Sequence, residues 1–178
     1  MRRAAGVLLL LSALSAGCGY SATRLLDPSY RTVYVAPFRN EIPITAEVSD
    51  RVGFQTSLPD LEERVTRGLI DRFLFDGNLR VTTNPSNADL LLDGVLIDFY
   101  RQPVRVLDNE NVEEYRLNLV ARVTLNRKDG KPLWGPVQLI GDTTYLVSGS
   151  SAVNETSAVD GLVTDFSRRV VERVLEDW

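Results

Sequence analysis

Two stretches of the chain place apolar residues at helical spacing. In the first, apolar side chains recur at intervals of one, three or four positions, at Leu61, Val65, Leu69, Ile70, Phe73 and Leu74. The second stretch runs from about Ser157 to Asp177, with apolar residues at Val159, Leu162, Val163, Phe166, Val170 and Val174. Since an α-helix turns once in about 3.6 residues, each pattern predicts an amphipathic helix that covers a sheet with one face.

The residues around these stretches indicate where the helices begin and end. Ser57 and Asp60 have the spacing of a capping box, so we expect the first helix to begin there. The pair Asp76–Gly77 should end it, because glycine readily adopts the left-handed conformation that closes a helix. Asn154 or Ser157 is the expected N-terminal cap of the second helix.

Runs of β-branched and aromatic residues between turn signals predict strands. Their ranges are 32–38, 79–83, 88–99 running on toward 106, 112–126, 133–140 and 143–147, the last two as separate strands or as one strand bent at Gly141. Apolar and polar residues alternate most clearly over 112–126, which is typical of an antiparallel strand with one face on the core. Residues 39–56 are expected to form a long loop. We therefore predict an α+β two-layer sandwich, a mainly antiparallel sheet of four to five strands with two helices packed on one face.

The N-terminus has the features of an export signal. Arg2 and Arg3 precede an apolar segment, residues 4–13, that is too short to span a bilayer as a helix. The following run, Leu14-Ser15-Ala16-Gly17-Cys18, resembles the lipobox of bacterial lipoproteins, in which the cysteine is acylated and becomes the first mature residue. The alternative is an ordinary signal peptide followed by a free thiol. We expect lipidation at Cys18.

Composition limits the chemistry that the chain can perform. Cys18 is the only cysteine and there is no histidine, which excludes Ser-His-Asp and Cys-His catalysis and histidine-based zinc sites. Glu113 and Glu114 are adjacent on a predicted strand, so their side chains point to opposite faces and cannot form a catalytic pair. With 20 basic and 24 acidic residues, the chain lacks the positive charge typical of nucleic-acid binders. We expect no catalytic residue, no metal, no cofactor and no nucleic acid.

The order of elements and three short runs of sequence resemble the lipopolysaccharide-assembly lipoprotein family, LptE. The runs are Cys18-Gly19-Tyr20, Thr32-Val33-Tyr34-Val35-Ala36-Pro37-Phe38-Arg39-Asn40 and Ala88-Asp89-Leu90-Leu91-Leu92-Asp93-Gly94. The resemblance implies a non-enzymatic lipoprotein on the periplasmic side of the outer membrane. It implies a β-barrel partner of the LptD type, which the lipoprotein plugs and helps to fold, and which places lipopolysaccharide in the outer leaflet. It also implies that basic residues could bind lipopolysaccharide.

The chain is then expected to have three parts. These are a lipoprotein signal peptide at 1–17, a lipidated tether at 18–31 and a single LptE-like α+β domain at 32–178. The alternative function is a periplasmic lipoprotein that regulates a peptidoglycan synthase. Such regulators usually carry a long disordered tether, whereas 14 residues would span at most roughly 50 Å. A carboxylate-based envelope hydrolase is disfavoured because the chain has no paired-acid motif.

Four arginines in the hairpin strands are the candidate contact residues for lipopolysaccharide or a protein partner. They are Arg101, Arg105, Arg116 and Arg122. Guanidinium groups can bind phosphate through two parallel hydrogen bonds, as in the headgroup of lipid A. The alternative is a solvated arginine face balanced by nearby acids, which are Asp98, Glu110, Glu113 and Glu114.

Overall fold

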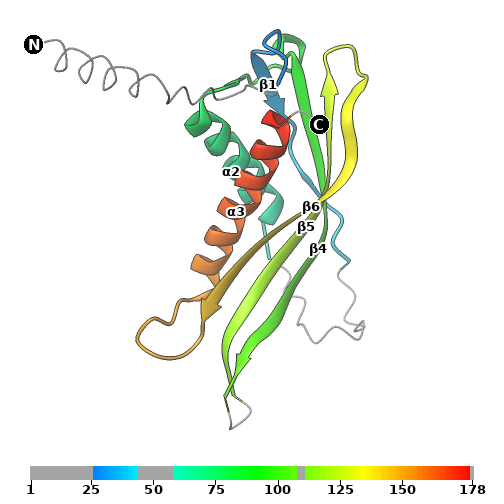
Figure 1. The fold of residues 1–178 in the computed structure, drawn as a ribbon. Helices are drawn as coiled ribbons and strands as arrows, with labels where there is room; N and C mark the ends of the chain where they lie inside the picture. The colour runs from blue at the N-terminus through cyan, green and yellow to red at the C-terminus, as the bar shows by residue number, and fades with distance from the viewer. Residues whose placement is uncertain (1–25, 44–57, 108–110, 177–178) are drawn as a thin grey trace, which may run out of the picture.

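The computed structural model describes residues 26–43, 58–107 and 111–176, and these form one sheet covered by two helices (Figure 1). In chain order the elements are β1 (Thr32–Val35), β2 (Arg39–Asn40), α2 (Leu61–Asp76), β3 (Arg80–Val81), the 3-10 turn η1 (Pro85–Asn87), β4 (Leu90–Val106), β5 (Val112–Arg127), β6 (Pro132–Leu146) and α3 (Glu155–Leu175). Cys18 lies outside the described residues. Within them, no helix is both long and apolar enough to cross a membrane.

The sheet confirms the predicted α+β class. Its strand order is β3-β1-β4-β5-β6, and β2 pairs separately with β4. The long strands β4, β5 and β6 are antiparallel, whereas the short β1, β2 and β3 make parallel pairs. The sheet has one strand more than the four to five that we predicted. The additional strand is β2, which lies at the start of the segment predicted to be a loop. Just after β2, Glu41 N–H donates to Leu96 C=O and keeps the chain against the sheet.

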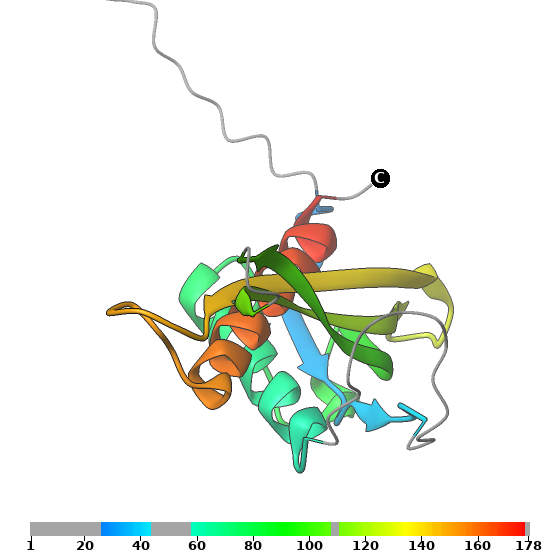
Figure 2. The ribbon, with the colours of Figure 1, turned by 90° about the horizontal axis from the view of Figure 1, so that it is seen from below.

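Both helices lie on one face of the sheet, as expected (Figure 2). The alternation predicted for β5 is confirmed on this face, where the buried side chains are Leu117, Leu119, Ala121, Val123 and Leu125. The opposite face differs at Asn118, which was expected in solvent and is only 6% exposed. Its cross-strand neighbours Tyr100 and Asp142 lie on either side of it and shield the amide.

The helix boundaries agree with the sequence except at the start of α2. Asp60 is the residue before the first helical turn, with φ of 60° and no side-chain capping hydrogen bond, so a capping box that uses Asp60 is not formed. Ser57 lies outside the described residues. Leu74, expected on the buried face, is exposed because it lies almost opposite Val65 around the helix axis. Asn154 caps α3 by accepting from Ser157 N–H at 2.8 Å, so of the two expected caps it is Asn154 that serves.

Gly141 does not interrupt the sheet, because β6 runs through it as one strand. Its missing side chain lets α3 pack closely, since a Cβ there would lie 2.6 Å from Phe166 Cβ and 2.8 Å from Phe166 Cα. Gly68 serves the same purpose between the helices, where a Cβ would lie 2.6 Å from Val163. These two glycines therefore allow one close approach between helix and sheet and one between the helices.

The Gly141→Ala variant should lower the free energy of unfolding by about 1–3 kcal/mol, because the added methyl forces the backbone of α3 away from the sheet. Gly161→Ala is the matched control, since its Cβ would meet only Thr143 Oγ1 at 3.3 Å and alanine favours the helix. Urea denaturation of both variants measures the difference. Equal stability of the two would show that α3 does not need the close contact at Gly141.

Candidate partner-binding surface

Arg101 is held inside the domain. It pairs across the sheet with Leu117, so its side chain lies on the helix-covered face. The guanidinium carbon lies 4.5 Å from the centre of the Tyr115 ring, and Nη1 lies 3.7 Å from Glu155. Burial alone would lower the pKa of Arg101, but the Tyr145 hydrogen bond and the Glu155 and Tyr115 charges outweigh it, so the pKa lies above its ordinary value. Arg101 is thus a charged residue already engaged by its own fold.

Arg105 lies near the end of the β4–β5 hairpin and is also paired. Its two terminal nitrogens lie 3.3 Å from Glu113 and 3.4 Å from Glu114, so both glutamates reach one guanidinium although they were expected on opposite faces. The strand register shifts at Arg105, which interrupts the regular alternation there. A phosphate would have to displace two carboxylates from this guanidinium. The neutralising acids expected from sequence are therefore present at Arg105.

Arg116 and Arg122 lie on the face that the helices leave open. Arg122 comes six positions after Arg116 along β5, a distance of about 20 Å at 3.3 Å per residue. Arg116 Nε lies 3.8 Å from Asp142, whereas Arg122 has no carboxylate at ion-pair distance among residues 26–43, 58–107 and 111–176. The four candidate arginines therefore occupy two faces and one hairpin end, and they do not converge on one point.

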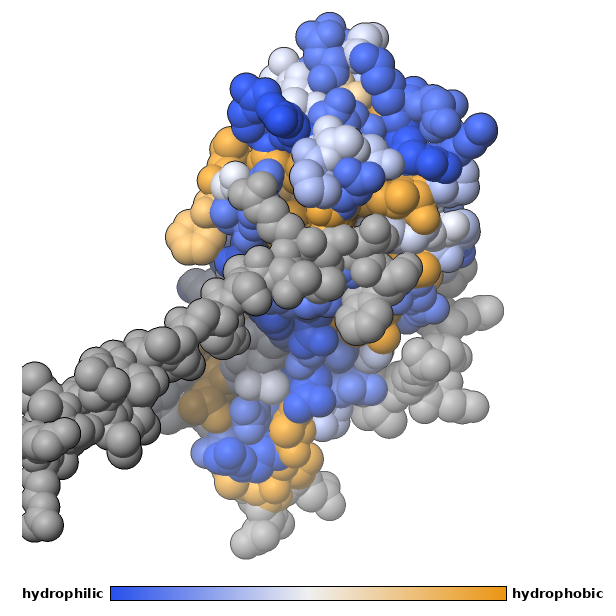
Figure 3. Space-filling view, turned by 45° about the horizontal axis from the view of Figure 1, so that its top comes forward, coloured by the Kyte–Doolittle hydropathy of each residue, from blue (hydrophilic) through white to orange (hydrophobic). Residues whose placement is uncertain are grey.

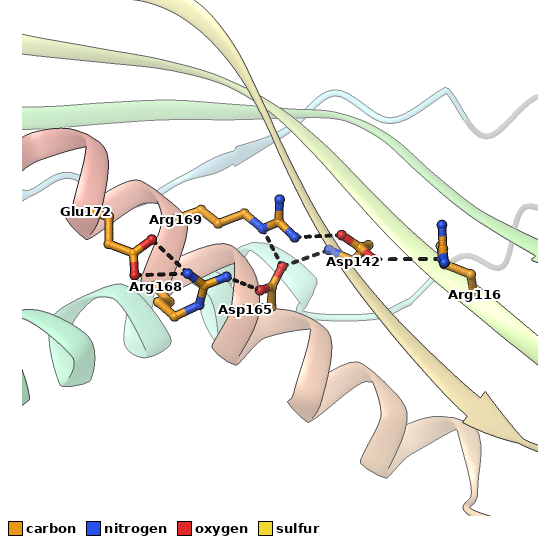
Figure 4. Close-up of polar contacts among 6 residues, drawn as sticks. All are labelled: Arg116, Asp142, Asp165, Arg168, Arg169 and Glu172. Carbon is orange, nitrogen blue, oxygen red and sulfur yellow. Dashed lines mark hydrogen bonds and ion pairs between the residues drawn. The ribbon is translucent and has the colours of Figure 1, made fainter. Parts of the chain in front are cut away.

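A chain of charges that the sequence did not suggest joins α3 to the outer edge of the sheet. Its six members are Arg116, Asp142, Arg169, Asp165, Arg168 and Glu172 (Figure 4). Arg169 bridges the two elements, because its guanidinium lies 2.7 Å from Asp142 on β6 and 2.6 Å from Asp165 on α3. The spacing of Asp165, Arg168, Arg169 and Glu172 along one helix could have indicated the helical part. The strand partner could not be read from the sequence.

Asp165 also binds a backbone N–H group on the outer side of the edge strand β6. Its carboxylate accepts from Asp142 N–H at 3.0 Å. Burial alone would raise the pKa of Asp165, but this bond and those from Arg168 and Arg169 outweigh it, so the pKa lies below its ordinary value. Further along β6, Leu146 C=O accepts from Val153 N–H at 2.9 Å. Two groups of the β6 edge are thus closed to a partner strand.

One end of the molecule carries a group of exposed apolar side chains, which we call the distal end. It comprises the end of the β4–β5 hairpin and the segment that follows β6, and its apolar residues are Val104, Val106, Leu107, Val147 and Val153. The two segments lie together because Val147 N–H donates to Glu113 C=O. Figure 3 shows apolar surface gathered at this lower end of the molecule. An exposed apolar group of this kind is typical of a surface that binds a partner.

The Asp165→Asn variant should be less stable than wild type at pH 7 by about 1–2 kcal/mol, because two guanidinium groups lose their anion at a partly exposed site. The folded-state pKa lies below the unfolded value of about 3.9, so the carboxylate stabilises the fold above that pH. This stabilisation is lost as pH falls through the folded pKa, so the stabilities of the two proteins should converge in urea denaturation as the pH is lowered below the ordinary aspartate range. Asp71→Asn, at an exposed acid of α2, is the control. A constant difference across pH would contradict the charge-based explanation.

No cluster of histidine, cysteine, aspartate or glutamate side chains in the described part of the chain is arranged to hold a metal ion. A search of curated proteins gave no significant match. Among solved structures, the hypothetical protein CT253 from Chlamydia trachomatis is similar with a TM-score of 0.55 and 13% identity, over 83% of this chain and 97% of that one. This similarity shows a shared fold.

Rare lipoprotein B from Shewanella oneidensis is similar with a TM-score of 0.46 and 14% identity, over 80% of this chain and 91% of that one. The model of the family described as LptE, lipopolysaccharide-assembly, matches residues 30–178. Because this match covers most of the sequence, the chain belongs to the LptE family of lipopolysaccharide-assembly proteins.

Proposed function

We propose that this protein is an outer-membrane lipoprotein, acylated at Cys18, that binds a β-barrel protein of the LptD type and helps it assemble. The barrel inserts lipopolysaccharide into the outer leaflet, and the lipoprotein acts without catalysis from the periplasmic side. The observation that carries this proposal is the match of residues 30–178 to the lipopolysaccharide-assembly family. We further propose the division into a signal peptide at 1–17, a lipidated segment at 18–31 and a domain at 32–178.

The distal end is the surface that we assign to the barrel. Its apolar side chains are exposed, and the nearby Arg105 is paired with Glu113 and Glu114, so these three groups carry one net negative charge. Burial of the apolar side chains favours association, and the three charged groups suit the polar rim of such a contact. The β4–β5 hairpin extends beyond the helices (Figure 1), so the distal end can enter a cavity that the helical part does not fill.

Direct contact with lipopolysaccharide is a separate part of the proposal. Arg122 is exposed on the open face of the sheet and Arg116 makes only a 3.8 Å contact with Asp142. These two can accept a phosphate with less rearrangement than Arg101 or Arg105, whose partners would have to be displaced. The 20 Å between them, estimated from strand geometry, requires two separate phosphates.

A pull-down with a C-terminal tag from detergent-solubilised outer membranes, followed by mass spectrometry, tests the assembly role. A stoichiometric large β-barrel protein is the expected co-purifying partner. Recovery of a peptidoglycan synthase in its place would reject the proposed function in favour of a regulator of cell-wall synthesis.

The Val106→Asp variant should recover at least tenfold less barrel protein in this pull-down, since a new charge would be buried without a partner at the distal end. Leu74→Asp adds the same charge to an exposed leucine of α2, outside the distal end, and should leave recovery unchanged. Circular dichroism and the amount of folded protein control for stability. Equal recovery of the two variants would remove the distal end from the interface.

Cys18→Ala should abolish labelling with radioactive palmitate and leave the precursor uncleaved, because no thiol remains to accept a lipid. Labelling in growing cells and the electrophoretic mobility of the product measure both effects. Persistent palmitate incorporation in the alanine variant would show that the anchor is elsewhere.

A further inference from the structure

The outer edge of β6 has one section whose backbone groups remain available to another strand. β6 is the last strand of the sheet, so it pairs on one side only, with β5 (Figure 2). Its register with β5 is regular from Val137 to Leu146. Along such a strand, the N–H and C=O groups of one residue turn toward the neighbouring strand and those of the next residue turn away. Alternate residues of β6 therefore present both backbone groups to the outside.

Two hydrogen bonds show which residues of β6 face outward. Val147 N–H donates to Glu113 C=O on β5, so the odd-numbered positions of this stretch face inward. Asp142 N–H donates instead to Asp165 on α3, which places the even-numbered positions on the outer side. The outward residues are Gln138, Ile140, Asp142, Thr144 and Leu146.

The fold closes part of this edge and leaves the rest open. The Asp165 carboxylate occupies the place beside Asp142 N–H (Figure 4), and Leu146 C=O accepts from Val153 N–H. At the start of the strand, Pro136 has no N–H to donate. Between these limits lie residues 137–141, which we call the open edge. Across the part of the chain that the structure describes, the outward N–H and C=O groups of the open edge meet no donor or acceptor.

The side chains of the open edge are accessible as well. Gln138 is exposed and Ile140 is 45% exposed, and both lie on the face of the sheet that the helices leave uncovered. Natural edge strands usually prevent pairing with a charge, a proline or a bulge, and residues 137–141 contain none of these. The open edge thus combines unpaired backbone groups with an apolar side chain beside them.

We propose that an extended segment of the barrel protein adds to the sheet as a further strand along the open edge. The outward groups of Gln138 and Ile140 alternate donor and acceptor at strand spacing, and an extended polypeptide offers the matching groups at the same spacing. The residue of that segment beside Ile140 should be apolar, because neighbouring side chains on one face of a sheet pack together. This inference rests on the barrel partner proposed above and adds a second contact to the distal end.

The size of the open edge favours this partner over a second copy of the chain. Its length is about 17 Å, or five residues, whereas a stable interface contains about 20–30 residues on each side. Pairing of two open edges alone is therefore too small to hold a dimer. Val147 of the distal end comes seven positions after Ile140, about 23 Å further along the strand. One partner can cover both surfaces, so that the added strand forms part of a larger interface.

Proline substitutions test the pairing, because proline at an outward position removes only an N–H that does not bond to β5. Ile140→Pro should lower recovery of the barrel protein in the tagged pull-down by roughly fivefold or more. Thr144→Pro is the matched control, since it removes an outward N–H of the same strand between the two closed groups, and it should leave recovery unchanged. Ile140→Ala removes only the side chain and should reduce recovery less than proline does. Equal recovery with the two proline variants would overturn the proposal.

Photo-cross-linking tests the same contact without a change to the backbone, and it decides the question even if the proline variants are unstable. Benzoylphenylalanine is introduced at position 138 or at position 140 of the full chain in growing cells. Because paired strands advance together, the two cross-linked sites should lie about two residues apart in one segment of the barrel protein. Cross-links scattered over several segments, or their absence, would overturn the proposal. Cross-links to residues 136–142 of a second copy would overturn it in favour of self-association.

Failure of the strand contact is distinguishable from failure of the proposed function. If Val106→Asp lowers recovery of the barrel protein and Ile140→Pro does not, the barrel partner stands and the strand pairing is rejected. If the wild-type chain recovers no barrel protein, the proposed function fails. Cross-linked sites about two residues apart in another envelope protein would then still support strand addition at the open edge, and their absence would reject it.

Discussion

The packing of α3 against the β5–β6 part of the sheet is the contact on which the rest of the structure depends. Phe166 lies directly over Gly141, and the Asp165 carboxylate receives the Asp142 N–H at the strand edge. The apolar contact brings the helix close, and the polar contact sets its position along the strand. Because both involve neighbouring residues on each element, sliding α3 by one residue would break them together.

This one-sided cover divides the long strands into two regions. Where α3 and α2 lie, the strands have a buried face and an edge that is partly closed by Asp165. Beyond the helices, the β4–β5 hairpin has no second layer, and its valine side chains remain exposed. Burial of one exposed large apolar side chain stabilises the buried state by about 1.5–3 kcal/mol. A complex in which a partner covers this region would therefore be stabilised by burial of these valines.

Regular patterns in the sequence predicted most of the fold, since the helical stretches and the alternating β5 each contain many residues that agree. Features that depend on a distant residue were not predictable. The sequence shows Gly141 as a break, but Phe166, 25 positions later, makes it a packing site. Asn118 was expected in solvent because the alternation of β5 places its side chain on the face away from the helices. The alternation does not show how much its cross-strand neighbours cover it, and these leave it only 6% exposed.

The four candidate arginines show that a binding site, too, could not be predicted where it depends on how distant residues are placed. Sequence placed four guanidinium groups in one hairpin, and a phosphate site would need several of them at one point. The β4–β5 register instead puts Arg101 on the helix-covered face with Tyr115, while Arg116 lies on the opposite face. Ion pairs within the fold engage three of these four arginines, whereas the exposed residues of the distal end are apolar. Association through the distal end should therefore depend on shape and burial more than on salt.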